Sequence, residues 1–291
     1  MSSYKIDTLD KLYTATSLKK WVEKSYAKQI KIGFVPTMGA LHQGHISLIQ
    51  QAKQENDVVI CSIFVNPTQF NNPDDLVKYP RTLSHDLTLL EEVDCDAVFI
   101  PTIEEVYPDY PNQTQFIELS LSSLGDVMEG KYRSGHFAGV VNVVYRFFDL
   151  VKPHNAYFGL KDYQQVAVIK HLVNEMGLPV NIVACPTLRE ASGLAKSSRN
   201  TRLSEQQKND AVVIYETLLL GKSKTHLMSP IALRNELAMN IENSVLKLEY
   251  IEIVNPDTLE PLTDKWVSGA VCCIAAYCGD VRLIDNMQFI A

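Results

Sequence analysis

Apolar and polar positions form two alternating patterns along the chain as far as residue 185. Short continuous apolar runs, which suit strands buried on both faces of a parallel sheet, occupy residues 30–35, 58–65, 97–100, 156–158 and 180–185. Between them, apolar residues recur with helical spacing over residues 45–56, 83–93, 137–151 and 162–176. This alternation predicts a parallel sheet with helices on both faces, which binds ligands beyond the carboxyl ends of its strands.

The pattern changes after Pro186. A loop rich in Gly, Ser and charged residues covers residues 188–200. Helical spacing then returns over residues 204–220 and 230–243, and strand-like runs follow at residues 248–254, 270–277 and 281–284. We therefore expect an α/β domain over residues 1–186 and a smaller α+β domain over residues 187–291.

Composition narrows the classes of function. The 291 residues are 46% hydrophobic and 21% charged, as in ordinary globular proteins, and the net charge of −7 weighs against a general nucleic-acid-binding surface. The six cysteines lie mostly in apolar runs and lack C-x-x-C spacing, which favours core positions over metal or redox sites. Residues 1–5 lack a signal-peptide core, and no apolar run approaches the ~18 residues of a membrane span, so we expect a cytoplasmic protein without a membrane partner.

The segment PTMGALHQGH, which ends at His45, is the most informative feature of the chain. It follows a strand-like run and precedes a helical pattern, so His42 and His45 lie in a loop that opens a helix. A helix N-terminus presents unpaired N–H groups and partial positive charge, which suit phosphate. The imidazoles can donate to phosphoryl oxygens, and Gly44 allows close approach to the backbone. The segment predicts a nucleotide-binding corner, although glycine-containing strand–loop–helix units are common in α/β folds.

Two further loops at strand ends carry candidate chemistry. Asn66 and Gln69 can hold an uncharged polar substrate because amides both donate and accept, and turn formation around Pro67 is the alternative. Lys161 can meet phosphate as a point charge, whereas the adjacent Asp162 can be a simple helix N-cap.

Two basic segments have the residue types of anion sites. Lys196, Ser197, Ser198 and Arg199 offer two hydroxyls and two cations that suit a triphosphate, and a solvated linker is the alternative. Arg133 and His136 precede the apolar stretch 137–151 and could meet an anion there, or form a basic surface turn.

Seven motifs in order give the chain a resemblance to a known family. They are PTMGALHQGH, SIFVNPTQF, YPRT, GHFAG, GLKDYQQ, SSRN and RLIDN. The chain resembles the pantoate–β-alanine ligases over nearly its whole length. The resemblance implies a Rossmann-like nucleotidyltransferase-type parallel sheet that binds ATP and pantoate, with the smaller C-terminal domain closing over the ATP site. It also implies a homodimer that uses ATP with Mg²⁺ to join (R)-pantoate to β-alanine through a pantoyl adenylate.

The resemblance assigns roles to positions of this sequence. His42, His45, Lys161 and Arg199 would be catalytic, with His45 as the proton donor. The ATP contacts would be Met38, Gly39, Ala40, Leu41, His42, Gln43, Gly44, His45, Gly159, Leu160, Lys161, Asp162, Leu188, Lys196, Ser197, Ser198 and Arg199. Gln69 and Gln165 would hold pantoate, with Asn66 and Tyr79 also at the substrate site and Gln69 near β-alanine.

Four positions depart from common family patterns. They are Ser134, Leu160, Ser192 and Lys196.

Three other functions are alternatives to a pantoate–β-alanine ligase. They are an adenylyltransferase with another acceptor, an aminoacyl-tRNA synthetase fragment and an inactive ATP-binding regulator. The two glutamines favour a neutral polyol pocket, the acidic charge disfavours tRNA, and the retained histidines and cations disfavour an inactive protein.

Overall fold

The computed structural model describes residues 9–290, and its contacts divide the chain into two compact units. Unit 1 comprises Met1–Ser120, Arg133–Gly159 and Val168–Cys185, and unit 2 comprises Leu121–Tyr132, Leu160–Ala167 and Pro186–Ala291. The predicted single boundary near residue 186 stays a prediction, because two earlier segments group with the C-terminal part of the chain. Residues 1–5, from which we argued against a signal peptide, lie outside the described residues.

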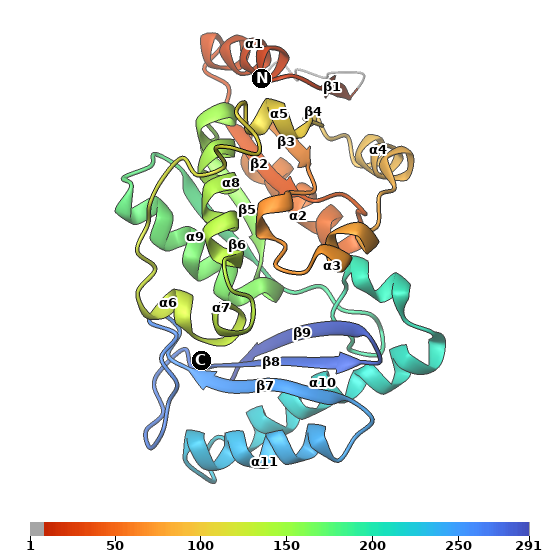
Figure 1. Cartoon of the computed structure of the whole chain (residues 1–291), viewed down its shortest axis with the longest axis vertical. Helices are drawn as coiled ribbons and strands as arrows, with labels where there is room; N and C mark the ends of the chain where they lie inside the picture. Colours follow the sequence, from red (N-terminus) through yellow and green to blue (C-terminus); the bar gives the residue numbers. More distant parts are fainter. Residues whose placement is uncertain (1–8, 291) are drawn as a thin grey trace. The chain divides into compact units, whose positions relative to one another are not determined.

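Unit 1 contains a six-stranded parallel sheet in the order β1-β4-β3-β2-β5-β6, which confirms the predicted fold class (Figure 1). Its strands are β1 (Asp10–Leu12), β2 (Ile32–Thr37), β3 (Val58–Ile63), β4 (Ala97–Phe99), β5 (Asn155–Gly159) and β6 (Asn181–Cys185). Five of these lie where continuous apolar runs predict them. The sixth, β1, was not predicted because its sequence DKL is short and mostly polar.

Helices pack against both faces of this sheet. The helices of this part of the chain are α1 (Ala15–Ala27), α2 (Gln43–Glu55), α3 (Pro73–Lys78), α4 (Leu83–Glu92), α5 (Ile103–Val106), α8 (His136–Val151) and α9 (Tyr163–Glu175), and the first residues of α9 belong to unit 2. On one face, Ile49 of α2 and Leu90 of α4 share a buried core with Val35 of β2. On the other face, Phe147 of α8 makes an edge contact with Phe34 of β2 at 5.8 Å between ring centroids.

The helix α1 was not among the predicted elements, although its sequence carries the signal. Leu18, Trp21, Val22 and Ser25 are buried at i, i+3, i+4, i+7 spacing, and Thr14 forms a capping box with Ser17. The strands and long helices that were predicted agree with the structure to within a few residues at their ends.

Unit 2 is built on the antiparallel sheet of β7 (Lys247–Val254), β8 (Val271–Cys278) and β9 (Val281–Gln288). Figure 1 shows α10 (Glu205–Lys224) and α11 (Pro230–Glu242) against one face of this sheet, and their leucines share a core with Ile251 and Ile274. The other sheet face packs Tyr250 and Cys273 against Met128, in the segment of α6 (Ser123–Asp126) and α7 (Met128–Tyr132).

Three smaller sequence expectations can be compared with the structure. All six cysteines are buried and carry free thiols, as expected for core positions. The predicted loop 188–200 is not irregular throughout, because the short 3₁₀ helix η3 (Ser198–Arg202) begins within it. Over residues 9–290, no helix is long and apolar enough to cross a bilayer.

Candidate active site

The histidine loop of unit 1, residues 38–45, is anchored by the buried carboxylate of Asp86. The N–H groups of Ala40 and Leu41 donate to its two oxygens at 3.0 and 2.8 Å, and the Thr82 hydroxyl donates at 2.9 Å. Gly39 and Ala40 both have positive φ, of 76° and 48°. A Cβ on Gly39 would lie 3.0 Å from an Asp86 oxygen, so glycine permits the approach. Asp86 therefore holds a strained loop in one conformation.

His42 and His45 together form the N-cap of α2. The Gly44 N–H donates to Nδ1 of His42 at 3.1 Å, and the His42 N–H donates to Nδ1 of His45 at 3.3 Å. Their ring centroids lie 4.1 Å apart. A ring nitrogen that accepts a hydrogen bond carries no proton, so each neutral imidazole bears its proton on Nε2. The cap thus fixes a tautomer in which both histidines offer an Nε2–H donor at a helix N-terminus.

The second predicted loop follows β3, where η1 (Pro67–Gln69) begins, and Asn66 is its centre. Asn66 is 1% exposed, and its carbonyl oxygen accepts from Thr68 and from the Tyr107 hydroxyl, the latter at 2.9 Å. Its amide donates to Gln69 Oε1 at 3.0 Å and to the Gly139 carbonyl at 3.3 Å. The Asn66 side chain is therefore fully engaged within unit 1, and a substrate contact would have to replace one of these bonds.

Gln69 links the two predicted loops of unit 1. Its Oε1 accepts from Asn66, while its Nε2 lies 3.3 Å from Sδ of Met38 in the histidine loop. Thioether sulfur is a weak acceptor, so a ligand oxygen could displace it at little cost. Tyr79 is buried, and its ring meets Phe70 edge-on at 5.8 Å.

Arg133 and His136 are connected to the Gln69 backbone. His136 is buried, and its Nδ1 lies 2.9 Å from the carbonyl of Gln69, which can only accept. His136 Nδ1 therefore donates, and its Nε2 accepts from the Arg133 guanidinium at 3.0 Å. Both ring nitrogens of His136 thus have partners within unit 1, and contact of Arg133 and His136 with an anion stays a prediction.

In unit 2, Lys161 lies in η2 (Leu160–Asp162), directly after the end of β5. The side-chain amide of Asn286, on β9, donates to the carbonyls of Leu160 and Lys161 at 2.8 and 2.9 Å. Among the described residues, the Lys161 ammonium has no hydrogen-bond or ion-pair partner. A cation on a fixed backbone with no internal partner suits an anionic ligand.

The adjacent Gln164 and Gln165 have different environments. Gln164 is buried; its oxygen accepts the Glu129 N–H at 2.9 Å, and its amide donates to the carbonyls of Leu124 and Val127 at 2.7 and 2.9 Å. Gln165, which the family resemblance assigns to pantoate, is only half-buried. Gln164 thus ties α6 and α7 to the start of α9, while the contact of Gln165 with pantoate stays a prediction.

The linker after β6 is held by Arg189. Its guanidinium forms two hydrogen bonds with the Asp285 carboxylate, at 2.5 and 2.9 Å, and lies 4.4 Å from the ring centroid of Tyr215. Gly193, at φ 96°, lies so close to Tyr215 that a Cβ would be 2.0 Å from the ring. These contacts fix residues 189–195, while the predicted ATP contact Leu188 is 39% exposed.

The predicted triphosphate loop has internal bonds of its own. Lys196 Nζ pairs with Glu190 at 2.8 Å, so a phosphate would have to compete with that carboxylate. The Ser197 hydroxyl oxygen accepts the Arg199 N–H at 3.3 Å, and Ser198 is buried. The amide of Asn200 donates to the Ala195 carbonyl at 3.0 Å, whereas its buried oxygen has no partner among the described residues.

Sequence reasoning missed a charged cluster in unit 2. Arg282 donates to Glu129 at 2.7 and 2.9 Å and also to Glu249, and the Tyr250 hydroxyl donates to Glu129 at 2.8 Å. Burial lowers the pKa of Arg282, but the hydrogen bonds and charges of the two glutamates outweigh it and raise that pKa. Arg282 belongs to the RLIDN motif, so its presence was a signal, but nothing local indicated a partner 153 positions away.

The structure therefore groups the predicted residues in two sets. Unit 1 brings together Met38, Gln69 and the two histidines, and unit 2 contains Lys161, Gln165 and residues 188–199. No group of three or more His, Cys, Asp or Glu that could hold a metal occurs in residues 9–290.

Comparison with known proteins gives a consistent result. The curated pantothenate synthetase of Porphyromonas gingivalis is 48% identical over 283 residues, which covers 95% of this chain and 98% of that protein. The one from Bacteroides fragilis is 45% identical over 287 residues, with coverages of 96% and 98%.

Solved structures agree with these sequence relatives. Pantothenate synthetase from Thermus thermophilus has a TM-score of 0.90 at 38% identity, and the match covers 97% of this chain and 100% of that one. Pantoate-beta-alanine ligase from Francisella tularensis, described as complexed with Beta-gamma ATP and Beta-alanine, has a TM-score of 0.80 at 41% identity, with coverages of 97% and 98%. The sequence profile of Pantoate-beta-alanine ligase matches residues 10–288. This chain therefore belongs to the pantoate–β-alanine ligase family.

Proposed function

We propose that this enzyme condenses (R)-pantoate with β-alanine to give pantothenate, using ATP and passing through a pantoyl adenylate. Family membership supports the overall reaction, and the Francisella relative is described as complexed with Beta-gamma ATP and Beta-alanine. The observation that carries the proposal is the pair of histidines at the start of α2, where both Nδ1 atoms accept hydrogen bonds of the helix cap and the ring protons are therefore on Nε2.

In the first step, a carboxylate oxygen of pantoate attacks the α-phosphorus of ATP. A bond forms between that oxygen and phosphorus, the α–β phosphoanhydride bond breaks, and pyrophosphate leaves. Negative charge grows on the transferred phosphoryl group and on pyrophosphate, so the rate depends on donors and cations held in place beforehand. We assign this role to His42, His45, Lys161 and Arg199, with the hydroxyls of Ser197 and Ser198.

His45 Nε2–H would donate a hydrogen bond to the leaving oxygen, and both imidazoles would act in the neutral form without transferring the proton. The N–H groups that bind Nδ1 favour the neutral form, because protonation of Nδ1 would break the cap. The backbone from Met38 to Gly44, residues 159–162, Leu188 and Lys196 would complete the ATP contacts. For Lys196, binding phosphate would mean giving up its pairing with Glu190.

Gln69 and Gln165 would bind the hydroxyls and carboxylate of pantoate, near Tyr79. Neutral amides suit this role because a cation would compete for the attacking carboxylate. Asn66 would act mainly by orienting Gln69, given its 3.0 Å bond to that side chain. In the second step, the β-alanine amine attacks the acyl carbon, AMP departs with the bridging oxygen, and the nitrogen loses a proton.

We further propose that magnesium enters as MgATP, in a cytoplasmic homodimer. Mg²⁺ prefers oxygen ligands and is commonly held by substrate phosphates and water with one or two carboxylates. Light scattering on purified protein would test the dimer.

ATP–pyrophosphate exchange tests the adenylate step directly. In an assay without β-alanine, labelled pyrophosphate should enter ATP only when (R)-pantoate is present, and adding β-alanine should then yield AMP and pantothenate. Exchange that depends on a different acceptor would contradict the substrate assignment. Absence of exchange with every acceptor would support an inactive ATP-binding protein instead.

A further inference from the structure

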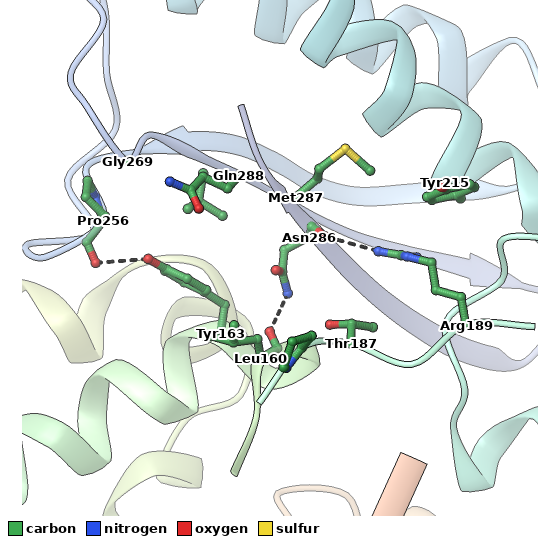
Figure 2. A pocket seen from close by; sticks show the side chains of 12 residues that line it. Leu160, Tyr163, Thr187, Arg189, Tyr215, Pro256, Gly269, Asn286, Met287 and Gln288 are labelled. Atoms are coloured by element: carbon green, nitrogen blue, oxygen red, sulfur yellow. Dashed lines mark hydrogen bonds between the residues drawn. The ribbon is translucent and has the colours of Figure 1, made fainter. Parts of the chain in front are cut away.

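Asn286 makes an unusual pair of bonds within unit 2. One amide nitrogen donates to two consecutive backbone carbonyls, Leu160 and Lys161, at 2.8 and 2.9 Å, and Figure 2 shows the bond to Leu160. The side chain is 9% exposed, so these bonds are shielded from water. An amide nitrogen has two protons, and both are used here on η2, the short turn that carries Lys161.

The backbone of Asn286 is also held by hydrogen bonds with Asp285 and Arg189. The Asn286 N–H donates to Asp285 Oδ1 at 2.8 Å, and the Asn286 carbonyl accepts from Arg189 at 3.3 Å. The Arg189 guanidinium, which forms two hydrogen bonds with Asp285, therefore also binds the backbone of Asn286. Figure 2 shows Asn286 directed at Leu160 from one side, with Arg189 approaching from the other.

The Leu160 turn borders open space within unit 2. Leu160, Tyr163, Thr187 and Asn286 line a cavity of about 380 Å³. The two hydrogen bonds of Asn286 reach η2 at the edge of this cavity and restrain the backbone from which the Lys161 side chain extends.

We propose that Asn286 is a positioning residue for the reaction, which sets the place of the Lys161 ammonium through the carbonyls of Leu160 and Lys161. This inference rests on the proposed role of Lys161 toward the ATP phosphates. A lysine side chain has four rotatable methylenes, so a small turn of its backbone moves the ammonium by a large distance. Misplacement by about 1 Å is enough to reduce a rate by up to ~100-fold.

Asn286→Asp is the sharpest test because it keeps the shape and removes both donors. The carboxylate would face two carbonyl oxygens and release the turn. Asn240→Asp is the matched control: Asn240 is an asparagine of α11 in the same unit, and its amide donates to the Thr217 hydroxyl. We expect Asn286→Asp to weaken ATP binding, measured by calorimetry, and pantoate-dependent exchange by about tenfold or more, with the KM for pantoate unchanged.

A double-mutant cycle with Lys161→Ala separates positioning from a general structural defect. If Asn286 acts through Lys161, then Asn286→Asp should change ATP affinity less than about twofold in the Lys161→Ala background. An equal loss in both backgrounds, or wild-type exchange in Asn286→Asp, would overturn the inference. Wild-type exchange in Lys161→Ala alone would instead remove the proposed role of Lys161, so the two failures are distinguishable. Asn286→Ala, which adds no charge, provides a second variant should the aspartate fail to fold.

Discussion

The carboxylate of Asp86 accepts the backbone N–H of Leu41 at 2.8 Å, across 45 positions of sequence. The bond joins α4 to the loop that ends in the two histidines, and Asp86 also binds the neighbouring N–H of Ala40. The conformation of this loop decides where His42 begins the helix α2. The placement of the proposed phosphate donors thus depends on an aspartate outside the histidine motif.

Replacing Asp86 with asparagine should therefore impair the first step as well as stability. One of the two N–H groups would face an amide that cannot accept, which costs about 1–3 kcal/mol for a buried group. We expect a raised KM for ATP in pyrophosphate exchange and a lower free energy of unfolding in urea. Asp57→Asn is the matched control, since Asp57 also accepts a backbone N–H, from Lys31, outside the histidine loop. Unchanged ATP kinetics in Asp86→Asn would contradict the anchoring role.

His45→Ala should slow adenylate formation by orders of magnitude while the protein stays folded. The variant loses the Nε2–H donor and one hydrogen bond of the cap, which is worth only about 1 kcal/mol. Single-turnover pyrophosphate release with saturating ATP and pantoate would measure the step. His171→Ala, which alters a histidine that bonds the Ser120 carbonyl, should leave that rate unchanged. Release at the wild-type rate in His45→Ala would exclude His45 from the reaction.

Alanine substitution should affect substrate binding at Gln165 and stability at Gln164. Gln165→Ala should raise the KM for pantoate more than the KM for ATP and leave the midpoint of thermal unfolding nearly unchanged. Gln164→Ala should lower that midpoint, because it removes the three hydrogen bonds that the buried Gln164 side chain makes with the Glu129 N–H and the Leu124 and Val127 carbonyls. Steady-state kinetics of both variants would measure the KM values, and calorimetric melting would measure the midpoints of unfolding. A pantoate KM that stays at the wild-type value in Gln165→Ala would rule out the pocket assignment.

Stability should fall at alkaline pH, partly because of Tyr107. Burial raises the pKa of Tyr107 to about 12 from an ordinary 10.0, although hydrogen bonds with Thr68 and Asn66 act in the opposite direction. Between pH 10 and 12 the unfolded chain would lose this proton while the folded one keeps it. The contribution of Tyr107 is then complete below pH 10 and declines by up to about 1.4 kcal/mol per pH unit above it.

Tyr107→Phe should flatten this decline. Urea unfolding between pH 8 and 11.5 should give two curves that converge toward high pH, with the variant less stable at pH 8 because it lacks the bond to Asn66. Parallel curves would show that Tyr107 does not titrate with unfolding.

Hydrophobic periodicity and the residue types of the loops were sufficient to predict the parallel sheet and the position of the histidine loop. The continuous run of β2 and the apolar spacing of α2 place His42 and His45 at a strand-to-helix loop without knowledge of the fold. The β-α succession likewise indicates the parallel sheet. These features are local, so a window of ten to twenty residues contains the information.

The residues that hold the site in place could not be found in that way. Asp86 is buried in α4, four residues before the buried Leu90. An acidic residue at the spacing of core residues was the signal that the sequence offered, but the N–H groups that Asp86 binds lie in another segment of the chain. In β9, Asp285 and Asn286 are both buried, which interrupts the alternation of a strand and marks the pair as special. What each binds depends on the fold, because Arg189 and Leu160 are about a hundred or more positions away.

The most direct test of the proposed pantoyl adenylate follows the transfer of a carboxylate oxygen from pantoate to AMP. Pantoate labelled with ¹⁸O in its carboxylate should be converted with ATP and β-alanine, and the products analysed by mass spectrometry. The proposed pantoyl adenylate predicts one ¹⁸O in AMP per turnover, since the attacking oxygen stays on phosphorus when the amine displaces AMP. Label in inorganic phosphate together with ADP would contradict the adenylate and indicate an acyl phosphate instead.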